Sequence, residues 1–252
     1  MHRFFIPPEW IDDNSVVIEG SQVHQILNVL RLRKGDRIAV LDNSGHEYEV
    51  TLSAVTKGQV HGVVAGRRLI AEPRARVTVY QAVLKGSRFD FMVQKCTELG
   101  VARFVPMLSE RCVVRRREVA SASKAERWRR IITEAAEQSG RGTLAVLARP
   151  VRFEQACQSA KGLSLLPWEG ESKLGLREVL REHVHGHESP FEVNLFVGPE
   201  GGFSRDEVEL AVDSGVLPVT LGRRVLRAET AGLVAATAVF FHCGDLDPVA
   251  SG

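Results

Sequence analysis

The sequence predicts a two-part protein of the α/β class, in which a small β-rich domain over residues 1–72 precedes an α/β domain over residues 73–252. Three observations support this fold class. Short apolar runs separated by turn residues fill the first part. From residue 75 onward, apolar runs alternate with segments of helical periodicity, which is typical of a mostly parallel sheet covered by helices. Glu72-Pro73 lies at the change of pattern and is interpreted as the linker.

The first domain is predicted to be a small barrel of short strands. One helix interrupts the strands, because Ser21 is suited to cap a helix and Val23, Ile26, Leu27 and Leu30 follow at helical spacing. Turn residues separate the strands, and this spacing is typical of a barrel. The predicted strands cover Val16–Ile18, Arg37–Leu41, Tyr48–Leu52 and Val60–Val64.

The second domain is predicted to alternate strands with helices. Residues 77–84 form a nearly continuous apolar run, as expected for a strand covered on both faces. Pro106 lacks an N–H group, so the strand Arg103–Leu108 is expected at an edge of the sheet, or Pro106 near its end. Ser204 and Glu207 form a capping box at the start of a helix. The further predicted strands are Leu163–Leu166, Val193–Val197 and Leu217–Leu221, and the other predicted helices run from Phe89 to Gly100, from Ser123 to Ser139 and from Ala228 to His242.

The composition is that of an ordinary globular protein. Of the 252 residues, 44% are hydrophobic and 25% are charged, which excludes disordered and fibrous classes. No apolar run approaches the roughly 18 residues of a membrane span, and the N-terminal residues show no signal peptide. The four scattered cysteines form no C-x-x-C pair, so they predict neither a zinc site nor a disulfide framework. We therefore expect a cytoplasmic protein with reduced thiols, no membrane partner and no metal.

The net charge of +2 hides an uneven distribution along the chain. Residues 1–72 carry a net charge of −1, residues 73–130 carry +9 from 14 basic and 5 acidic residues, and residues 131–252 carry −6. A clustered cationic surface is typical of a protein that binds a polyanion. The alternative, a solvated helix face, explains the same residues equally well. The basic residues concerned are Arg111, Arg115, Arg116, Arg117, Lys124, Arg127, Arg129 and Arg130.

Three familiar motif types predict no site in this chain. Residues 140–145 match G-x-G-x-x-A, but they follow a helix rather than a strand, so they do not support a dinucleotide site. His183, His185 and His187 alternate in a polar segment and are interpreted as a solvated loop rather than as metal ligands. No G-x-S-x-G or P-loop motif is present, so hydrolase and nucleotidase functions lack an anchor.

The segment from Phe196 to Ser204 leaves the carboxyl end of a buried strand and enters a capped helix. Ligands of open α/β sheets bind at that edge. Glycines around Pro199 and Glu200 let the backbone approach a ligand closely. The Glu200 carboxylate could face a cation or accept a hydrogen bond from a hydroxyl group. The alternative is a tight strand–helix turn without a ligand.

The segment Leu221–Ala231 also lies between a strand and a helix. Its glycine, arginine and apolar residues could wrap a flat heterocycle, with backbone groups contacting the edge of the ring. Thr230 or Glu229 could instead cap the final helix. Because the two segments follow successive strands, they are expected to lie side by side, which strengthens the prediction of one ligand site.

Together these segments resemble the signature of the RsmE family. Its members are SPOUT-class methyltransferases that methylate N3 of a uridine in bacterial 16S ribosomal RNA. The matching motifs are Gly198-Pro199-Glu200-Gly201-Gly202 and the whole of Leu221–Ala231. The resemblance covers nearly the whole chain, because similar stretches also occur at Arg3–Phe5, between His24 and Asp36, at Gln94–Val101 and at Ser109–Arg111.

The resemblance implies a SPOUT α/β knot, a trefoil in which the chain threads through a loop, preceded by a PUA-like β-barrel that contacts RNA. It also implies that the loops of the knot hold S-adenosylmethionine in a bent shape. The enzymes of this family are homodimers with their sites at the subunit interface. The positions that match cofactor-binding residues are Leu166, Val197, Gly198, Pro199, Glu200, Gly201, Leu221, Gly222, Val225, Leu226 and Thr230.

The implied reaction requires removal of the proton from uracil N3 and alignment of N3 with the methyl group. The sulfonium methyl is already activated, so no metal is needed, and positioning supplies much of the rate. We assign Glu229 as the base and Arg227 as the cation that stabilises the developing imide anion. The alternative is that Arg227 binds phosphate and Glu229 caps the helix.

The implied partner is 16S ribosomal RNA, free or within the 30S subunit. The candidate RNA-contact residues are Arg3, His24, Arg31, Arg33, Arg111, Arg115, Arg116 and Arg117. Two other functions stay open. One is a SPOUT methyltransferase that acts on a ribose 2′-oxygen, and the other is a non-catalytic RNA-binding factor for ribosome assembly.

Overall fold

Two structural units make up the described chain, which comprises residues 1–113, 121–184 and 191–248 of the computed structural model. Unit 1 consists of Met1–Glu72 together with Thr133–Leu144. Unit 2 consists of Pro73–Ile132 together with the described residues from Ala145 onward. The sequence analysis placed residues 133–144 in the second domain, whereas the structure groups them with the first unit.

A six-stranded sheet, counted over the described residues, forms the body of unit 1. Its first two neighbours, β1 and β4, are parallel, and the other pairs are antiparallel. Side chains alternate between the two faces of each strand, which brings Phe4, Ile18, Ile38 and Val50 into one apolar core. In spatial order the strands are β1 (His2–Phe5), β4 (Arg37–Leu41), β5 (His46–Val55), β6 (Val60–Leu69), β3 (Ser15–Ile18) and β2 (Ile11–Asp12).

The predicted helix of unit 1 is a short α-helix, α1 (Ser21–His24), that continues as a π-helical turn over Gln25–Val29. The prediction that Ser21 is its N-cap is wrong by one residue. Gly20 holds the N-cap position with a φ of 66°, a conformation that glycine adopts without steric cost. A 3-10 turn over Pro8–Trp10 lies between β1 and β2.

The end of helix α4 (Ala122–Ser139) packs within unit 1. Ala136 contacts Phe5 and Leu41, and a carboxylate oxygen of Glu137 accepts a 2.9 Å hydrogen bond from the Phe5 N–H group. A helical pattern specifies which face of a helix is apolar but not which sheet that face covers. The assignment of residues 133–144 to unit 1 therefore required the structure.

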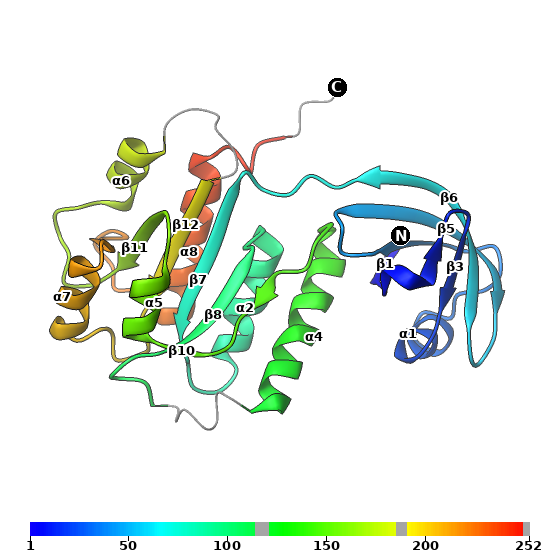
Figure 1. Ribbon diagram of the computed structural model, residues 1–252, viewed down its shortest axis with the longest axis horizontal. Helices are drawn as coiled ribbons and strands as arrows, with labels where there is room; N and C mark the ends of the chain where they lie inside the picture. Colours follow the sequence, from blue (N-terminus) through cyan, green and yellow to red (C-terminus); the bar gives the residue numbers. More distant parts are fainter. Residues whose placement is uncertain (114–120, 185–190, 249–252) are drawn as a thin grey trace. The chain divides into compact units, whose positions relative to one another are not determined.

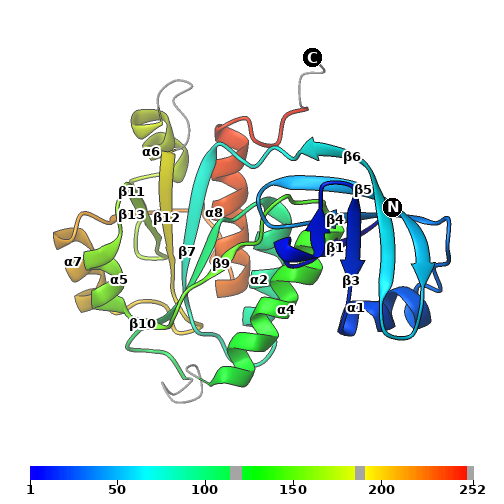
Figure 2. The ribbon, with the colours of Figure 1, turned by 45° about the vertical axis from the view of Figure 1, so that its right-hand side comes forward.

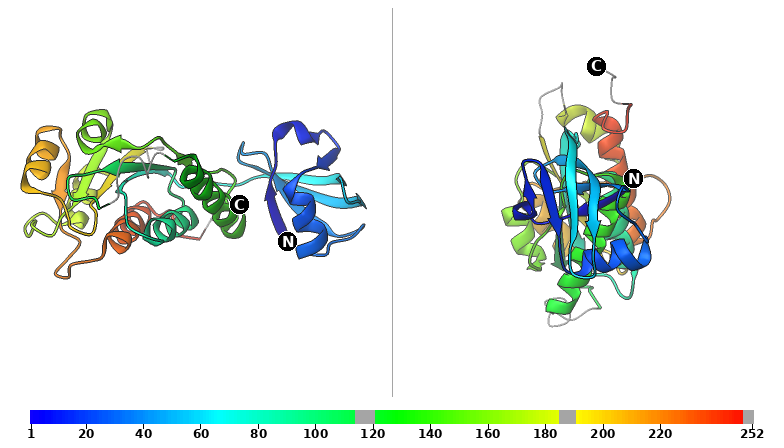
Figure 3. Two further views of the ribbon diagram at one scale, coloured as in Figure 1. Left: turned by 90° about the horizontal axis from the view of Figure 1, so that it is seen from below. Right: turned by 90° about the vertical axis from the view of Figure 1, so that its right-hand side faces the viewer.

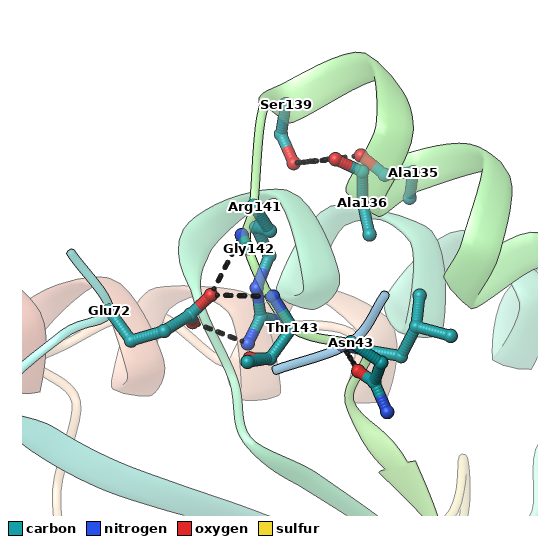
Figure 4. Close-up of polar contacts among 9 residues, drawn as sticks. Asn43, Glu72, Ala135, Ala136, Ser139, Arg141, Gly142 and Thr143 are labelled. Carbon is teal, nitrogen blue, oxygen red and sulfur yellow. Dashed lines mark hydrogen bonds and ion pairs between the residues drawn. The ribbon is translucent and has the colours of Figure 1, made fainter. Parts of the chain in front are cut away.

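Glu72 organises the loop that follows α4 (Figure 4). Its carboxylate accepts hydrogen bonds from the N–H groups of Gly142 and Thr143, at 3.1 and 3.0 Å, and from the Arg141 guanidinium at 2.9 Å. Asn43 Oδ1 accepts from the Leu144 N–H group at 2.7 Å. The loop that matches G-x-G-x-x-A therefore directs N–H groups toward a carboxylate of its own chain.

A parallel sheet forms the centre of unit 2 (Figure 1). Its order places β7 between β8 and β12, so the chain first builds the sheet on one side of β7 and then returns to the other side. Ligands bind where the order of strands reverses in this way. In spatial order the strands are β10 (Val151–Arg152), β8 (Arg103–Leu108), β7 (Ala75–Ala82), β12 (Phe191–Val197), β11 (Leu163–Pro167) and β13 (Leu217–Val219), and β9 (Val146–Leu147) also pairs with β8.

Helices cover both faces of this sheet (Figures 1 and 3). Helices α2 (Arg88–Leu99) and α8 (Ala228–His242) pack together on one face, and α8 contacts β7 and β12 (Figure 2). Helices α5 (Phe153–Ser159) and α7 (Arg205–Asp213) share a core with Tyr80 and Phe196 on the other face. The Tyr80 and Phe196 rings stack with centroids 4.6 Å apart.

Most predicted elements of unit 2 are present, and the differences have local causes. The Ser204–Glu207 capping box is confirmed by hydrogen bonds of 3.3 and 3.0 Å. Pro106 lies within β8 rather than at its end, and β8 has neighbours on both sides. On the outer side, β9 pairs with Arg103–Phe104 and β10 with Met107–Leu108, so Pro106 occupies the gap between these two short partners.

Two short helices, α5 and α6 (Leu176–His183), were not predicted, because seven or eight residues display little periodicity. His183 lies in the last turn of α6, with its Nδ1 3.0 Å from the Val179 carbonyl oxygen, so its assignment to a loop is wrong. His185 and His187 lie outside the described residues. Within the parts of the chain that the structure describes, no helix is both long and apolar enough to span a membrane.

Candidate functional site

A pocket of about 580 Å³ lies at the carboxyl edge of the parallel sheet in unit 2. Three loops line it, and each of them follows one of the adjacent strands β11, β12 and β13. The starts of helices α2 and α8 complete the wall with Arg88, Ala228 and Glu229. A volume of this size is typical of small-molecule sites, which span about 300–1,000 Å³.

The loop after β12 contributes the first predicted motif to the pocket. Gly202 has a φ of 66°, and its N–H group donates to the Pro199 carbonyl oxygen at 3.0 Å, which closes a tight turn. Glu200 Oε1 accepts hydrogen bonds from the Lys85 N–H group at 3.0 Å and from Arg88 Nη1 at 2.9 Å. Five predicted cofactor positions line the pocket here, namely Val197, Gly198, Pro199, Glu200 and Gly201.

The loop after β13 contributes the second predicted motif. Leu221, Gly222, Val225 and Leu226 line the pocket, as does Arg227, which is the N-cap residue of α8. Two predicted cofactor residues do not line it. Leu166 is fully buried in β11, and Thr230 is half-buried in the first turn of α8 with its N–H group bonded to the Arg227 carbonyl oxygen at 2.9 Å.

The loop after β11 also lines the pocket, and the sequence analysis missed it. Trp168, Glu169 and Glu171 come from this loop. The Trp168 N–H group donates to the Val219 carbonyl oxygen at 3.1 Å, which ties the loop to β13. Backbone N–H groups of Lys173 and Leu174 lower the pKa of Glu171 below its usual value. The predicted strand ending at Leu166 already indicated that its following loop would reach the same edge.

Glu229 places an unpaired carboxylate oxygen in the pocket wall. Its Oε1 lies 4.0 Å from Arg88 Nε, and its buried Oε2 has no hydrogen-bond partner among the described residues. The N-cap of α8 is Arg227, and no side-chain capping hydrogen bond is present there in the described part of the chain. Neither Glu229 nor Thr230 therefore holds the N-cap position that the alternative interpretation gave to one of them.

Arg88 was not predicted as a site residue. It lies in the first turn of α2, and its guanidinium bridges Glu200 and Glu229, which come from two different loops. No local motif marks this residue, because its relevance depends on the packing of α2 against α8. The pocket thus combines carboxylates with arginines from several elements.

The predicted RNA-contact residues fall in both units. In unit 1, His24, Arg31 and Arg33 are exposed, whereas Arg3 donates from Nε to the buried Glu47 carboxylate at 2.8 Å. In unit 2, Arg111 is exposed, and its Nη1 donates to the Gly201 carbonyl oxygen in the pocket loop at 3.0 Å. The remaining three, Arg115, Arg116 and Arg117, lie outside the described residues.

The thiols are placed in the core rather than in the pocket. Burial raises the pKa of Cys96 and of Cys157 to about 12 and that of Cys243 to about 11. These thiols are therefore protonated at neutral pH and are poor nucleophiles. Among the described residues, no cluster of three or more histidine, cysteine or acidic side chains is arranged to hold a metal ion.

Comparison with known proteins assigns the chain to a family. A model of an RNA methyltransferase domain matches residues 71–240, and a model of an RNA methyltransferase PUA domain matches residues 18–65. The ribosomal RNA small subunit methyltransferase E of Synechocystis sp. is 37% identical, over 93% of this chain and 75% of its own length. The protein of the same name from Bacillus subtilis is 32% identical, over 96% of this chain and 97% of its own.

The chain belongs to the ribosomal RNA small subunit methyltransferase E family. Solved structures agree with this assignment to methyltransferase E. A putative methyltransferase from Legionella pneumophila, solved with the bound cofactor SAM, has a TM-score of 0.83 and 32% identity, and covers 94% of this chain and 96% of its own. A methyltransferase E from Neisseria gonorrhoeae bound to S-adenosyl methionine has a TM-score of 0.82 and 30% identity, with the same coverage of both chains. The mixed α/β methyltransferase fold with a PUA domain is thus established for this chain.

Proposed function

We propose that this protein transfers the methyl group of S-adenosylmethionine to N3 of a specific uridine in 16S ribosomal RNA of the small subunit. The observation that carries the proposal is the pocket at the carboxyl edge, which is built from the two family motifs and a third loop. Family membership supports the reaction class, and relatives with bound cofactor support the choice of methyl donor. Because ribosomes are its substrate in this account, a cytoplasmic location follows.

S-adenosylmethionine fits the residues that line the pocket. Gly202 and Gly222, with φ values of 66° and 112°, expose backbone groups without a side chain between them and a ligand. The unpaired Oε2 of Glu229 offers an acceptor to a donor group of a ligand or to a cation. When bound, the cofactor supplies an activated methyl group on a sulfonium. We assign its binding to Val197, Gly198, Pro199, Glu200, Gly201, Leu221, Gly222, Val225 and Leu226, with Leu166 and Thr230 supporting the wall from behind.

The chemistry requires a base and a stabilising cation beside the target base. Glu229 is the proposed base, because its unpaired oxygen is held in the wall of the pocket and can accept the N3 proton. Arg227 precedes it by two residues, lines the same pocket and is exposed, so it can approach a uracil carbonyl oxygen. In this account both residues act from the start of α8, which fixes their spacing.

We propose that unit 2 contains the trefoil knot of the SPOUT class. The segment after β13 runs beside the loop after β11, since Thr220 N donates to Leu174 O at 2.9 Å and Leu176 N donates to Thr220 O at 3.2 Å. The chain enters this region from α7 on one face of the sheet and leaves it into α8 on the other. Threading through the loop after β11 accounts for this change of face. For unit 1, the order of its sheet supports the proposal of a PUA-like barrel.

We propose a homodimer that forms through the outer face of α2 and α8. Phe241 is 73% exposed, and Val234 on the same helix and Phe91 on α2 are also exposed. Helix α8 is apolar on both sides, although its inner side alone is needed for the core. Exposed apolar residues grouped on packed helices are typical of association surfaces.

We assign RNA binding to both units, through Arg3, His24, Arg31 and Arg33 in the first and through Arg111 and Arg115–Arg117 in the second. The +9 charge of residues 73–130 supports this assignment, because phosphate contacts depend on clustered cations. The Arg3 side chain shares Glu47 with Arg68, so one carboxylate faces two guanidinium groups and the set keeps a positive charge. Arg67 and Arg68 join the candidates, because both are exposed on β6.

The test is transfer of labelled methyl groups from S-adenosylmethionine to small-subunit particles that lack the modification. Labelled RNA is the expected result, and protein-free RNA assayed in parallel decides which form is the substrate. A 2′-O-methylated product would indicate another SPOUT activity. Cofactor binding without transfer would indicate a non-catalytic assembly factor. Absence of cofactor binding to the folded protein would overturn the proposal.

A further inference from the structure

We propose that Gln81 is a positioning residue that holds the β12 loop in the shape that binds the cofactor. Gln81 lies near the end of β7, directly opposite Val197, the last residue of β12. It is fully buried and does not line the pocket. The proposal rests on the proposed function for the identity of the ligand, but its structural part does not.

The amide of Gln81 reaches across the end of the sheet to the first residues of the pocket loop. Its Nε2 donates to the carbonyl oxygen of Gly198 at 3.2 Å, to that of Val197 at 3.4 Å and to that of Ala82 at 3.1 Å. Val197 and Gly198 both line the pocket. One side chain therefore fixes the direction of the carbonyl groups at the point where the chain leaves β12.

The orientation of this amide is determined by its surroundings. With the amide reversed, Oε1 would face three carbonyl oxygens and no donor. In the orientation described, Oε1 faces the α8 side, where a Cβ atom on Gly232 would lie 3.4 Å away, and it has no partner among the described residues. A buried acceptor without a partner is unfavourable, so an apolar residue of similar shape would suit this position better if packing were its role. The donor contacts with the pocket loop account for a glutamine here.

A second set of contacts grips the same loop from the same direction. Lys85 and Arg88, which follow β7 in the chain, hold the Glu200 carboxylate. Gln81 thus fixes the beginning of the loop, and the β7–α2 connection fixes its middle. Between these two points the loop contains Gly198 and Pro199, which line the pocket. Loss of the Gln81 contacts frees the beginning of the loop while its middle stays anchored.

Asn194 supplies a matched control. It is a buried amide on the same strand, and its Nδ2 donates to the Lys161 carbonyl oxygen at 2.6 Å and to Ser164 Oγ at 3.1 Å. These partners lie beyond the pocket lining, toward the amino end of the strand. Replacement of either amide by an apolar residue removes buried hydrogen bonds and lowers stability, but only one of them touches the cofactor loop.

The experiment compares the wild-type protein with the variants Gln81→Met and Asn194→Leu in two measurements on the full chain. Calorimetry with S-adenosylmethionine should give a Kd about tenfold higher for Gln81→Met, because small displacements of a binding loop have large effects. The Kd of Asn194→Leu should equal that of the wild type. Amide hydrogen exchange without ligand should be faster over residues 198–203 in Gln81→Met alone.

Equal affinity and equal exchange in Gln81→Met and wild type would overturn the proposal, as would the same losses in Asn194→Leu. If the wild type binds no cofactor, the proposed function fails, and hydrogen exchange still decides whether Gln81 holds the loop. If Gln81→Met does not fold, Gln81→Asn replaces it, since the shorter side chain keeps the amide but withdraws it from Gly198. In steady-state assays the KM for S-adenosylmethionine should rise and that for RNA should not.

Discussion

Arg88 Nη1 lies 2.9 Å from Glu200 Oε1, which joins the first turn of α2 to the loop after β12. The same guanidinium approaches Glu229 Oε1 at 4.0 Å, so one cation separates two carboxylates in the pocket wall. Arg88 is 43% exposed, and an ion pair of this kind contributes at most about 1 kcal/mol to stability. Its effect on the arrangement of the pocket should be larger than its effect on folding.

The first prediction is that Arg88→Gln weakens cofactor binding with little change in Tm. The substitution leaves Glu200 and Glu229 facing each other without a cation, so the loop after β12 loses an anchor. We expect the Kd for S-adenosylmethionine to rise about tenfold, which equals about 1.4 kcal/mol. The control is Arg177→Gln on the exposed side of α6, which should change neither quantity. Equal Kd values in both variants would contradict the role given to Arg88.

Glu229→Gln should abolish most methyl transfer and preserve cofactor binding. The amide keeps the size of the side chain but cannot accept the N3 proton, and general bases contribute about 10²–10⁴-fold to rates. Single-turnover transfer to small-subunit particles measures the effect. Glu178→Gln, an exposed residue of α6, serves as the control. Unchanged transfer with intact binding would remove Glu229 from the mechanism.

Gly202→Ala should disturb the pocket more than an alanine at another glycine of unit 2. Gly202 has a φ of 66°, and a Cβ atom would lie 2.4 Å from Glu169 Oε1, so both the backbone and the neighbouring pocket residue must move. The backbone part costs about 1 kcal/mol or more. Gly175→Ala is the control, because that glycine has a φ of −83° and open space around it. Similar Kd values for the two variants would show that the turn at Gly202 does not shape the site.

The stability of unit 1 should fall in acid because of Glu47, which is 3% exposed. Burial raises the pKa of Glu47, but hydrogen bonds and charges from Arg3 and Arg68 outweigh it and hold the pKa below the usual 4.5. A lowered pKa contributes stability above the unfolded value, and the contribution is lost as pH falls below about 5. Glu47→Gln should therefore flatten the acid limb of urea-unfolding midpoints, and an unchanged slope would contradict this.

Glu137 provides the control of opposite sign in the same unit. Burial raises its pKa, the Phe5 N–H group opposes the rise and Glu134 adds to it. A raised pKa contributes stability below the usual value, which is lost as pH increases through the folded pKa. Glu137→Gln keeps an acceptor for Phe5, so it should stabilise the protein at pH 7 and not in acid. Parallel curves for the Glu47 and Glu137 variants would refute the assignment of both groups.

Phe241→Asp should produce monomers. The ring is 73% exposed on the outer side of α8, and a carboxylate placed in an apolar interface is strongly unfavourable. Sedimentation velocity at several concentrations measures the change. Val212→Asp, an equally drastic substitution at an exposed position of α7, is the control. A dimer that survives Phe241→Asp would place the interface elsewhere.

Several parts of the site could be predicted from the sequence because they follow directly from local pattern. The loops after Val197 and Val219 each leave a buried parallel strand, and parallel strands end at the same edge of a sheet. Nine of the eleven predicted cofactor residues line one pocket for this reason. Leu166 does not, because it belongs to a strand interior, and Thr230 does not, because it turns with α8 away from the lining.

The contributions of Arg88, Gln81 and Trp168 could not be predicted from local pattern. Arg88 reaches the pocket only because α2 packs against α8, and Gln81 only because β7 pairs with β12. The partners of Arg88 and Gln81 are more than one hundred residues away in the chain. The assignment of residues 133–144 to unit 1 has the same cause, since Glu72 and Asn43 supply the partners of that loop.

The central claim is that the pocket supports methylation of uracil N3 in small-subunit RNA. The most direct measurement is mass spectrometry of nucleosides from unmodified 30S particles, after incubation with the protein and isotope-labelled S-adenosylmethionine. The account predicts labelled 3-methyluridine with the wild type and at least about 100-fold less with Glu229→Gln. Labelled 2′-O-methyl nucleosides, or no labelled nucleoside from a protein that binds the cofactor, would contradict it.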